Sequence, residues 1–150
     1  MTHFPINLAN LSQLTIGRFP FTTCITTRWM DNDMYGHVNN VNYYSYFDTA
    51  INEFLIKKAN FNPLNSEQIG FIVKSSCEFI HPISYPGSLI VGVAIKRVGN
   101  SSVDYVAAIF DANETLCATG ELTHVFVERI SQKPQAIDEE LREVILNYQG

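Results

Sequence analysis

One long helical pattern constrains the fold of this chain more than any other feature. Residues 41–59 carry aromatic and aliphatic side chains at helical spacing, and neither proline nor glycine interrupts them. Asn60 and the turn-forming residues after it predict where the helix ends. A helix with so wide an apolar face needs a broad surface to pack against. Its apolar positions are Tyr43, Phe47, Ala50, Ile51, Phe54 and Leu55.

The sequence on either side of this helix is typical of β-strands. Short turns join the last three expected strands, which predicts an antiparallel meander. The fold class is therefore α+β, with a five-stranded antiparallel sheet and one long helix to cover it. We expect one domain over residues 1–150 with a core at 19–128, an N-terminal extension at 1–18, and a C-terminal helix within 132–150, centred on 136–148. The expected strands are 19–29, 69–80, 89–98, 102–111 and 116–127.

The strand at residues 89–98 is apolar on both of its alternating faces. Leu89 and Val91 point to one side, whereas Ile90 and Ala94 point to the other. Charged residues make up only 17% of the chain, below the usual quarter, while 46% are apolar. One long helix covers only one face of the sheet, so we expect a second copy to cover the rest, in a homodimer or homotetramer.

Charge and composition exclude several classes of protein. The net charge of −5 argues against binding nucleic acid through its phosphates. The longest apolar run, residues 89–95, is too short to span a membrane, and the N-terminus lacks the pattern of a secretory signal. Cys24, Cys77 and Cys117 are far apart and odd in number, which argues against a disulfide framework or a metal knuckle. We therefore expect a cytoplasmic protein.

Polar side chains concentrate in residues 28–48, just before and within the start of the long helix. Two carboxylates and an imidazole lie there around one glycine. The unpaired N–H groups and the positive dipole of the helix N-terminus favour a developing oxyanion. Serine-hydrolase, zinc-protease and nucleotide-binding signatures are absent from the sequence. The polar residues are Asp31, Asp33, His37, Asn39, Asn40 and Asn42.

Each of these residues also has a purely structural interpretation. Asn39 or Asn40 could cap the helix, and Asp31 and Asp33 could form turns or interact with the helix dipole. A single histidine such as His37 is more often packed and hydrogen-bonded than catalytic. Their concentration beside a helix N-terminus nevertheless favours a functional site over the structural interpretation.

This stretch resembles the signature of the hotdog-fold acyl-CoA thioesterases, the 4-hydroxybenzoyl-CoA thioesterase-like family. The similarity extends over residues 19–128, through His81 and Pro82, Gly87, and the last expected strand. The resemblance implies a hotdog fold, in which a five-stranded antiparallel sheet wraps around one long helix. The matched positions are Trp29, Asp31, Asp33, Gly36, His37, Val38, Asn39, Asn40 and Tyr43.

The resemblance also implies an activity, the hydrolysis of acyl-CoA thioesters to a free acid and coenzyme A without a metal or redox cofactor. Asp33 matches the family's catalytic carboxylate, acting as nucleophile or as general base, and the Asn40 N–H matches the donor to the thioester oxygen. His37 and the Asn39 side chain match residues at the carbonyl end of the substrate. Tyr43 matches a position beneath the acyl group, although it could equally be a core aromatic.

The match to the family is weakest where the coenzyme A phosphates bind. Relatives carry a basic cluster after the strand at 89–98, whereas this chain has Lys96 and Arg97 before a turn that ends at Ser102. We assign these three residues to coenzyme A. Three alternatives remain open: cleavage of thioesters on an acyl carrier protein, a hydratase with His37 as its main base, and a non-catalytic acyl-thioester binding dimer. His124 is expected in the core or at an interface.

Overall fold

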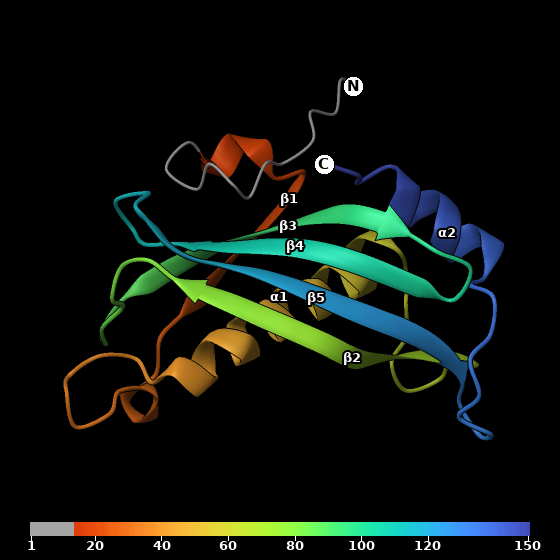
Figure 1. Ribbon diagram of the computed structural model, residues 1–150, viewed down its shortest axis with the longest axis horizontal. Helices are drawn as coiled ribbons and strands as arrows, with labels where there is room; N and C mark the ends of the chain where they lie inside the picture. Colours follow the sequence, from red (N-terminus) through yellow and green to blue (C-terminus); the bar gives the residue numbers. More distant parts are fainter. Residues whose placement is uncertain (1–13) are drawn as a thin grey trace.

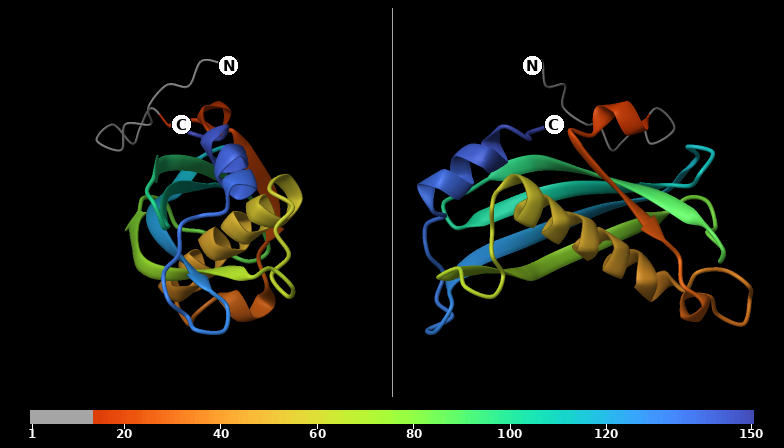
Figure 2. Two further views of the ribbon diagram at one scale, coloured as in Figure 1. Left: turned by 90° about the vertical axis from the view of Figure 1, so that its right-hand side faces the viewer. Right: turned by 180° about the vertical axis from the view of Figure 1, so that it is seen from behind.

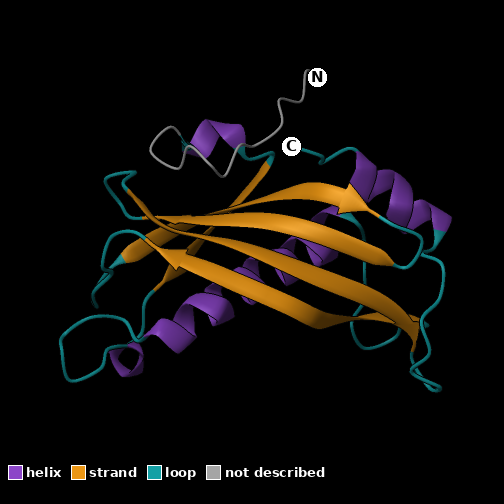
Figure 3. Ribbon diagram, in the orientation of Figure 1, coloured by secondary structure: helices purple, strands orange, loops and turns teal. Residues whose placement is uncertain are grey.

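The computed structural model describes residues 14–150. The expected N-terminal extension therefore lies largely outside the described residues, apart from its last part, which includes the short 3-10 turn η2 (Ile16–Arg18). The other elements follow the expected order along the chain (Figures 1 and 3). They are β1 (Phe21–Thr26), η3 (Trp29–Asp31), α1 (Asn40–Lys58), β2 (Gln68–Phe79), β3 (Ser88–Val98), β4 (Ser102–Phe110), β5 (Leu116–Glu128) and α2 (Glu139–Leu146).

The strands form one five-stranded sheet in the order β1-β3-β4-β5-β2, and every neighbouring pair is antiparallel. Strands β3, β4 and β5 form the expected meander. The sheet curves around α1, which lies along its inner face (Figure 2). This confirms the α+β hotdog arrangement that the helical pattern and the resemblance both predict.

Helix α1 packs on the sheet through the face that its sequence pattern predicts. Phe47, Ala50, Ile51 and Phe54 are fully buried between the helix and the strands. The β3 residues that face them have odd numbers, from Leu89 to Ile95, as the alternation requires. These side chains form the main core of the described chain.

Two predicted elements are shorter than expected. Strand β1 was expected at 19–29, but it ends at Thr26, because the next residues turn out of the sheet into η3. Helix α2 was expected over 136–148, yet the N–H of Ile137 bonds to the carbonyl of Asn100 at 2.9 Å. That bond holds the chain in an extended path up to Asp138, the N-cap position of the helix.

The outer face of the sheet has more cover within the chain than the sequence suggested. Phe19, just before β1, packs across β3 and β4 in a second cluster with Ala94, Val106, Ala108 and Phe110. The premise that only a second copy could cover this face is therefore wrong for the middle of β3 and β4. Ile16, within the expected extension at 1–18, is partly buried and packs against the same cluster.

Strand β2 is one of the two edge strands of the sheet, and β1 is the other. In the described part of the chain β2 pairs with β5 alone, and its other edge is open. Phe71, Ile72, Val73 and Phe79 are all more than a third exposed, and Val73 reaches 60%. A long edge strand with exposed apolar side chains can pair with a strand of another chain, which would extend the sheet.

Within residues 14–150, no helix is both long and apolar enough to cross a membrane.

A candidate active site at the start of the long helix

The loop between β1 and α1 is built around a buried carboxylate, Asp31. Its side chain is fully buried and accepts hydrogen bonds from the Arg28 N–H at 2.9 Å, from Arg28 Nε at 3.0 Å and from the Tyr46 hydroxyl at 2.6 Å. Burial raises the pKa of Asp31, but the bonds from Tyr46 and Arg28 outweigh it and hold the pKa below its usual value. Asp31 is therefore a charged anchor of the loop.

The main chain of Asp31 links the same loop to the helix. Its carbonyl accepts the Asn39 N–H at 2.8 Å and the Asn42 side-chain amide at 3.0 Å. Val38, just before the helix, donates its N–H to the carbonyl of Ile83 at 2.7 Å, in the segment between β2 and β3. These bonds set the position of the loop relative to the first turn of α1.

Asp33 lies in a tight turn within this loop. Its N–H donates to the carbonyl of His37 at 2.9 Å, and its own carbonyl accepts the Gly36 N–H at 3.1 Å. Gly36 has a φ of 79°, a conformation that side chains other than glycine rarely adopt. The Asp33 carboxylate is partly exposed and accepts the Tyr35 N–H at 2.8 Å. Asp33 and His37 therefore close the same turn.

The helix begins at Asn40, and Asn39 is its N-cap. The Asn39 side-chain oxygen accepts the Val41 N–H at 3.1 Å. Asn39 and not Asn40 is therefore the cap, and the capping bond uses the oxygen of the side chain that the resemblance placed at the carbonyl end of the substrate. The N–H of Asn40 belongs to the first turn, where the amides have no acceptor within the helix. That amide therefore lies at the N-terminus of a helix that ends at Lys58, where the helix dipole places partial positive charge.

A cavity of about 230 Å³ lies beside this helix start. From the loop and helix it is lined by His37, Val38, Asn40 and Tyr43, and from the end of β2 by residues 79–82. Asp33 and Asn39 are not among the lining residues. The structure therefore brings His37, Asn40 and Tyr43 together around one cavity. Asp33 lies outside the lining, in the turn whose main chain it closes with His37.

Tyr43 forms an inner wall of this cavity. Its side chain is 4% exposed, and its ring lies 4.9 Å from the ring of Phe79 in an edge-to-face contact. Burial raises the pKa of the Tyr43 hydroxyl, although a bond with the main chain of Ile83 opposes this. The hydroxyl thus remains protonated at neutral pH.

The three residues assigned to coenzyme A lie elsewhere. Lys96 and Arg97 are near the end of β3, and Ser102 opens β4, at the end of the sheet that carries α2 rather than the end that carries the loop (Figure 1). Lys96 forms an ion pair with Glu121 at 2.6 Å, which raises the Lys96 pKa. Within one chain, these residues do not meet the cavity at the start of α1.

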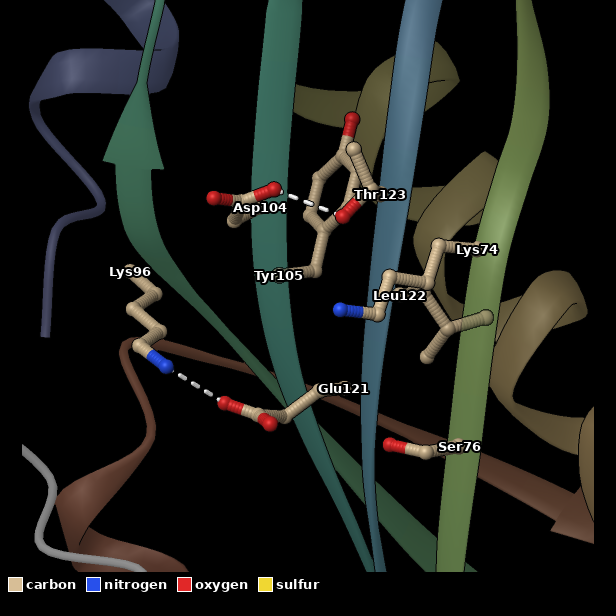
Figure 4. Close-up of a pocket in the computed structure, with 8 residues that line it drawn as sticks. All are labelled: Lys74, Ser76, Lys96, Asp104, Tyr105, Glu121, Leu122 and Thr123. Carbon is tan, nitrogen blue, oxygen red and sulfur yellow. Dashed lines mark hydrogen bonds and ion pairs between the residues drawn. The ribbon is translucent and has the colours of Figure 1, made fainter.

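Lys96 borders a second, polar cavity of about 150 Å³, which spans strands β2 to β5 (Figure 4). Lys74 and Lys96 extend toward it from opposite sides, and the Thr123 hydroxyl donates to Asp104 at 2.6 Å. Its two lysines are balanced by the carboxylates of Asp104 and Glu121. This cavity therefore has no excess positive charge with which to hold a phosphate.

Two further residues complete the comparison with the sequence predictions. His124 is buried, its Nδ1 lies 3.0 Å from the Tyr105 hydroxyl, and burial lowers its pKa to about 4, which confirms the core interpretation. The sequence did not predict the role of Tyr46 as the partner of Asp31. In the sequence, Tyr46 is simply one more aromatic residue in the helical pattern. Among residues 14–150, no group of three or more His, Cys, Asp or Glu side chains could hold a metal ion.

The chain is similar to known proteins over most of its length. Residues 27–145 match the family described as the thioesterase-like superfamily. The PA5185 protein from Pseudomonas aeruginosa strain PAO1 is 43% identical, with a TM-score of 0.87 over 91% of this chain and 96% of that one. Slr0204, a 1,4-dihydroxy-2-naphthoyl-CoA thioesterase from Synechocystis, shares the fold at 18% identity, with a TM-score of 0.77 over 85% of this chain and 96% of its own. The uncharacterized protein YsmA from Bacillus subtilis (strain 168) is 26% identical over 86% of this chain and 87% of its own length.

Proposed function

This chain belongs to the thioesterase-like superfamily, a family of thioester hydrolases, and on that premise we propose that it hydrolyses acyl-CoA thioesters to a free acid and coenzyme A. The observation that carries the proposal is the cavity at the N-terminus of α1, with Asn40 in its wall and the Asp33 turn beside it. The proposed steps use side chains and main-chain amides alone.

The thioester carbonyl oxygen lies at the Asn40 N–H in this proposal. Attack on the carbonyl carbon moves negative charge onto that oxygen, and the helix N-terminus stabilises it. Stabilising the carbonyl oxygen alone is sufficient, because the thiolate of coenzyme A is a good leaving group and needs no strong acid to protonate it. His37 lies in the cavity wall, where it orients the carbonyl end of the substrate. Asn39 retains its side-chain N–H groups for the same task, since its oxygen caps the helix.

Asp33 supplies the attack by one of two routes. As a nucleophile, its oxygen bonds to the carbonyl carbon, the C–S bond breaks with its electron pair on sulfur, and water then hydrolyses the acyl-enzyme. As a general base, it takes a proton from a water molecule whose oxygen adds to the carbonyl carbon, and the C–S bond of the adduct then breaks with its electron pair on sulfur, which takes up the proton. Either route needs a carboxylate whose position is set, and the turn closed by His37 and Gly36 sets it.

A thiol-release assay tests the activity directly. A thiol-reactive dye added to the protein with an acyl-CoA should report free coenzyme A at a rate that scales with protein concentration. Binding of acyl-CoA with no thiol release would favour the non-catalytic binding dimer instead. Hydration of an unsaturated acyl-CoA without thiol release, lost in His37→Ala and retained in Asp33→Asn, would favour the hydratase. Comparing one acyl group on coenzyme A and on acyl carrier protein identifies the carrier.

The open edge of β2 supports a homodimer in which a second copy extends the sheet. The cavity is lined by residues at the end of this same strand, so a partner there would border the cavity and the pantetheine arm of the substrate would run between protomers. The three cysteines are all free, as suits the reducing cytoplasm in which we place the protein.

We predict that Val73→Lys weakens this dimer. Val73 is 60% exposed on β2, and a charge on an edge strand opposes pairing with another strand. Light scattering during gel filtration should show a dimer for the unchanged protein and an increase of about 10-fold or more in the dissociation constant for the variant. Leu64→Lys is the control, because Leu64 is 83% exposed and lies in the turn before β2. An unchanged protein that is monomeric at micromolar concentration would contradict the proposal.

The assignment of Lys96, Arg97 and Ser102 to the coenzyme A phosphates also depends on the dimer, since these residues lie far from the cavity of their own chain. We predict that Arg97→Ala raises KM for an acyl-CoA about 5-fold, the loss of one exposed ionic contact. KM for the same acyl group on pantetheine, which lacks the nucleotide, should not change. Lys58→Ala, at the exposed end of α1, is the control. An equal change in both KM values would contradict a phosphate contact.

A further inference from the structure

Two aromatic rings that contact each other line the cavity. Tyr43 from α1 meets Phe79 from β2 at 4.9 Å with an interplanar angle of 72°. Phe79 is 47% exposed, so its ring faces both Tyr43 and the open side of the cavity. These rings form a floor between the helix and the sheet, one helical turn below Asn40.

A second layer lies behind this floor. Phe47, one turn beyond Tyr43 on the same face of α1, is fully buried against β5 at Gly120. A Cβ atom on Gly120 would lie 2.6 Å from the Phe47 ring, so the ring lies directly on the strand's main chain. Ile51 and Phe54 continue the filled layer toward the end of the helix. Among residues 14–150, these side chains fill the space between α1 and the sheet beyond the cavity.

We infer that the cavity holds the acyl group of the substrate and that Tyr43, Phe79 and Phe47 restrict it to compact acyl groups, a single aromatic ring or a short chain. This inference rests on the proposed function. A dry cavity of about 150 Å³ accommodates benzene. The cavity of about 230 Å³ therefore has room for one ring together with the thioester carbonyl.

Turnover of a series of acyl-CoAs by the unmodified protein tests the size limit. Acetyl-, hexanoyl-, benzoyl-, decanoyl- and dodecanoyl-CoA are compared at concentrations below micelle formation. We expect kcat/KM for the better of hexanoyl- and benzoyl-CoA to exceed that for dodecanoyl-CoA by about 100-fold, since each misplaced methylene costs at least several-fold. Comparing kcat/KM for benzoyl-CoA with that for hexanoyl-CoA shows whether the preferred compact acyl group is aromatic or aliphatic. Equal kcat/KM values along the series would overturn the inference.

Two substitutions test the residues that set the limit. Phe79→Ala removes the exposed half of the floor, and Phe47→Leu shortens the layer behind it without emptying the core. Each should raise the ratio of kcat/KM for decanoyl-CoA to that for hexanoyl-CoA by about 10-fold. Phe54→Leu is the matched control, because Phe54 is equally buried on the same helix face but two turns beyond Phe47. A ratio that changes as much in Phe54→Leu as in Phe47→Leu would exclude a specific role for Phe47.

A binding measurement separates this inference from the proposed function. S-alkyl and S-benzyl thioethers of coenzyme A cannot be hydrolysed, and calorimetry gives their Kd values. If no acyl-CoA releases thiol but compact thioethers bind more tightly than long ones, the proposed hydrolysis fails and the size limit stands. If thiol is released but Kd and kcat/KM are both independent of chain length, the hydrolysis stands and the size limit fails.

Discussion

Replacing Asp33 by Asn should lower kcat for acyl-CoA hydrolysis by about 10²–10⁴-fold, the usual contribution of a positioned catalytic base or nucleophile. Asparagine retains an oxygen that can accept the Tyr35 N–H, so the turn should keep its shape while the negative charge is lost. KM should change little, because the residues that line the cavity, and not the attacking carboxylate, supply the contacts that bind the substrate before the reaction. The measurement is thiol release at saturating substrate, with thermal unfolding of the variant as a check on its folding.

Asp138→Asn is the matched control for this experiment. Asp138 is an exposed aspartate at the N-cap position of α2, where its side chain makes no capping bond. It lies at the other end of the sheet from the loop, so the same substitution there should leave kcat unchanged. If Asp33→Asn retains full turnover, Asp33 is not the attacking group. If it retains turnover while His37→Ala does not, the base is the imidazole.

Replacing Asp31 by Asn should have the largest effect on stability, about 3 kcal/mol of the free energy of unfolding. The substitution leaves the buried Tyr46 hydroxyl and the half-exposed Arg28 guanidinium without their anionic partner. Chemical denaturation at neutral pH measures the loss. Tyr46→Phe removes one hydrogen bond and keeps the carboxylate, so its loss should be smaller, about 1.5 kcal/mol.

The same carboxylate predicts how stability depends on pH. The pKa of Asp31 is lower in the folded protein than its usual value of 3.8, so the unfolded chain binds a proton more readily. The stabilisation by Asp31 is therefore complete well above pH 4 and is lost as the pH falls below 4 through the folded-state pKa. The difference in unfolding free energy between the unmodified protein and Asp31→Asn should shrink over that window. A difference that is constant from pH 7 to pH 2 would contradict an ionised Asp31.

The elements of the fold were predictable because they depend on local periodicity. The helical pattern at 41–59 places α1 within one residue at each end, and the strands from β2 to β5 differ from their predicted bounds by one residue. Short turns determine the pairing of β3, β4 and β5, because two strands joined by a few residues can only lie antiparallel.

The site was predictable in its location but not in its detail. Asp31 and Asp33 have the same chemistry and lie two residues apart, so their sequence context does not distinguish an anchor from a reactive group. The distinction arises because Tyr46, fifteen residues on, places its hydroxyl on Asp31 across the first turns of α1. The aromatic floor likewise depends on Phe79, which β2 brings to Tyr43 from another part of the chain.

The sequence by itself determined the helix, the strands, the family and the loop that carries the polar residues, since each depends on side chains close together along the chain. Only the tertiary structure decided which aspartate is buried, that Asn39 and not Asn40 caps the helix, that Phe19 covers the outer face of the sheet, and that Lys96 lies far from the cavity. The physical reason is that burial and hydrogen-bond partners are set by contacts between distant segments, and periodicity carries no information about which segments meet.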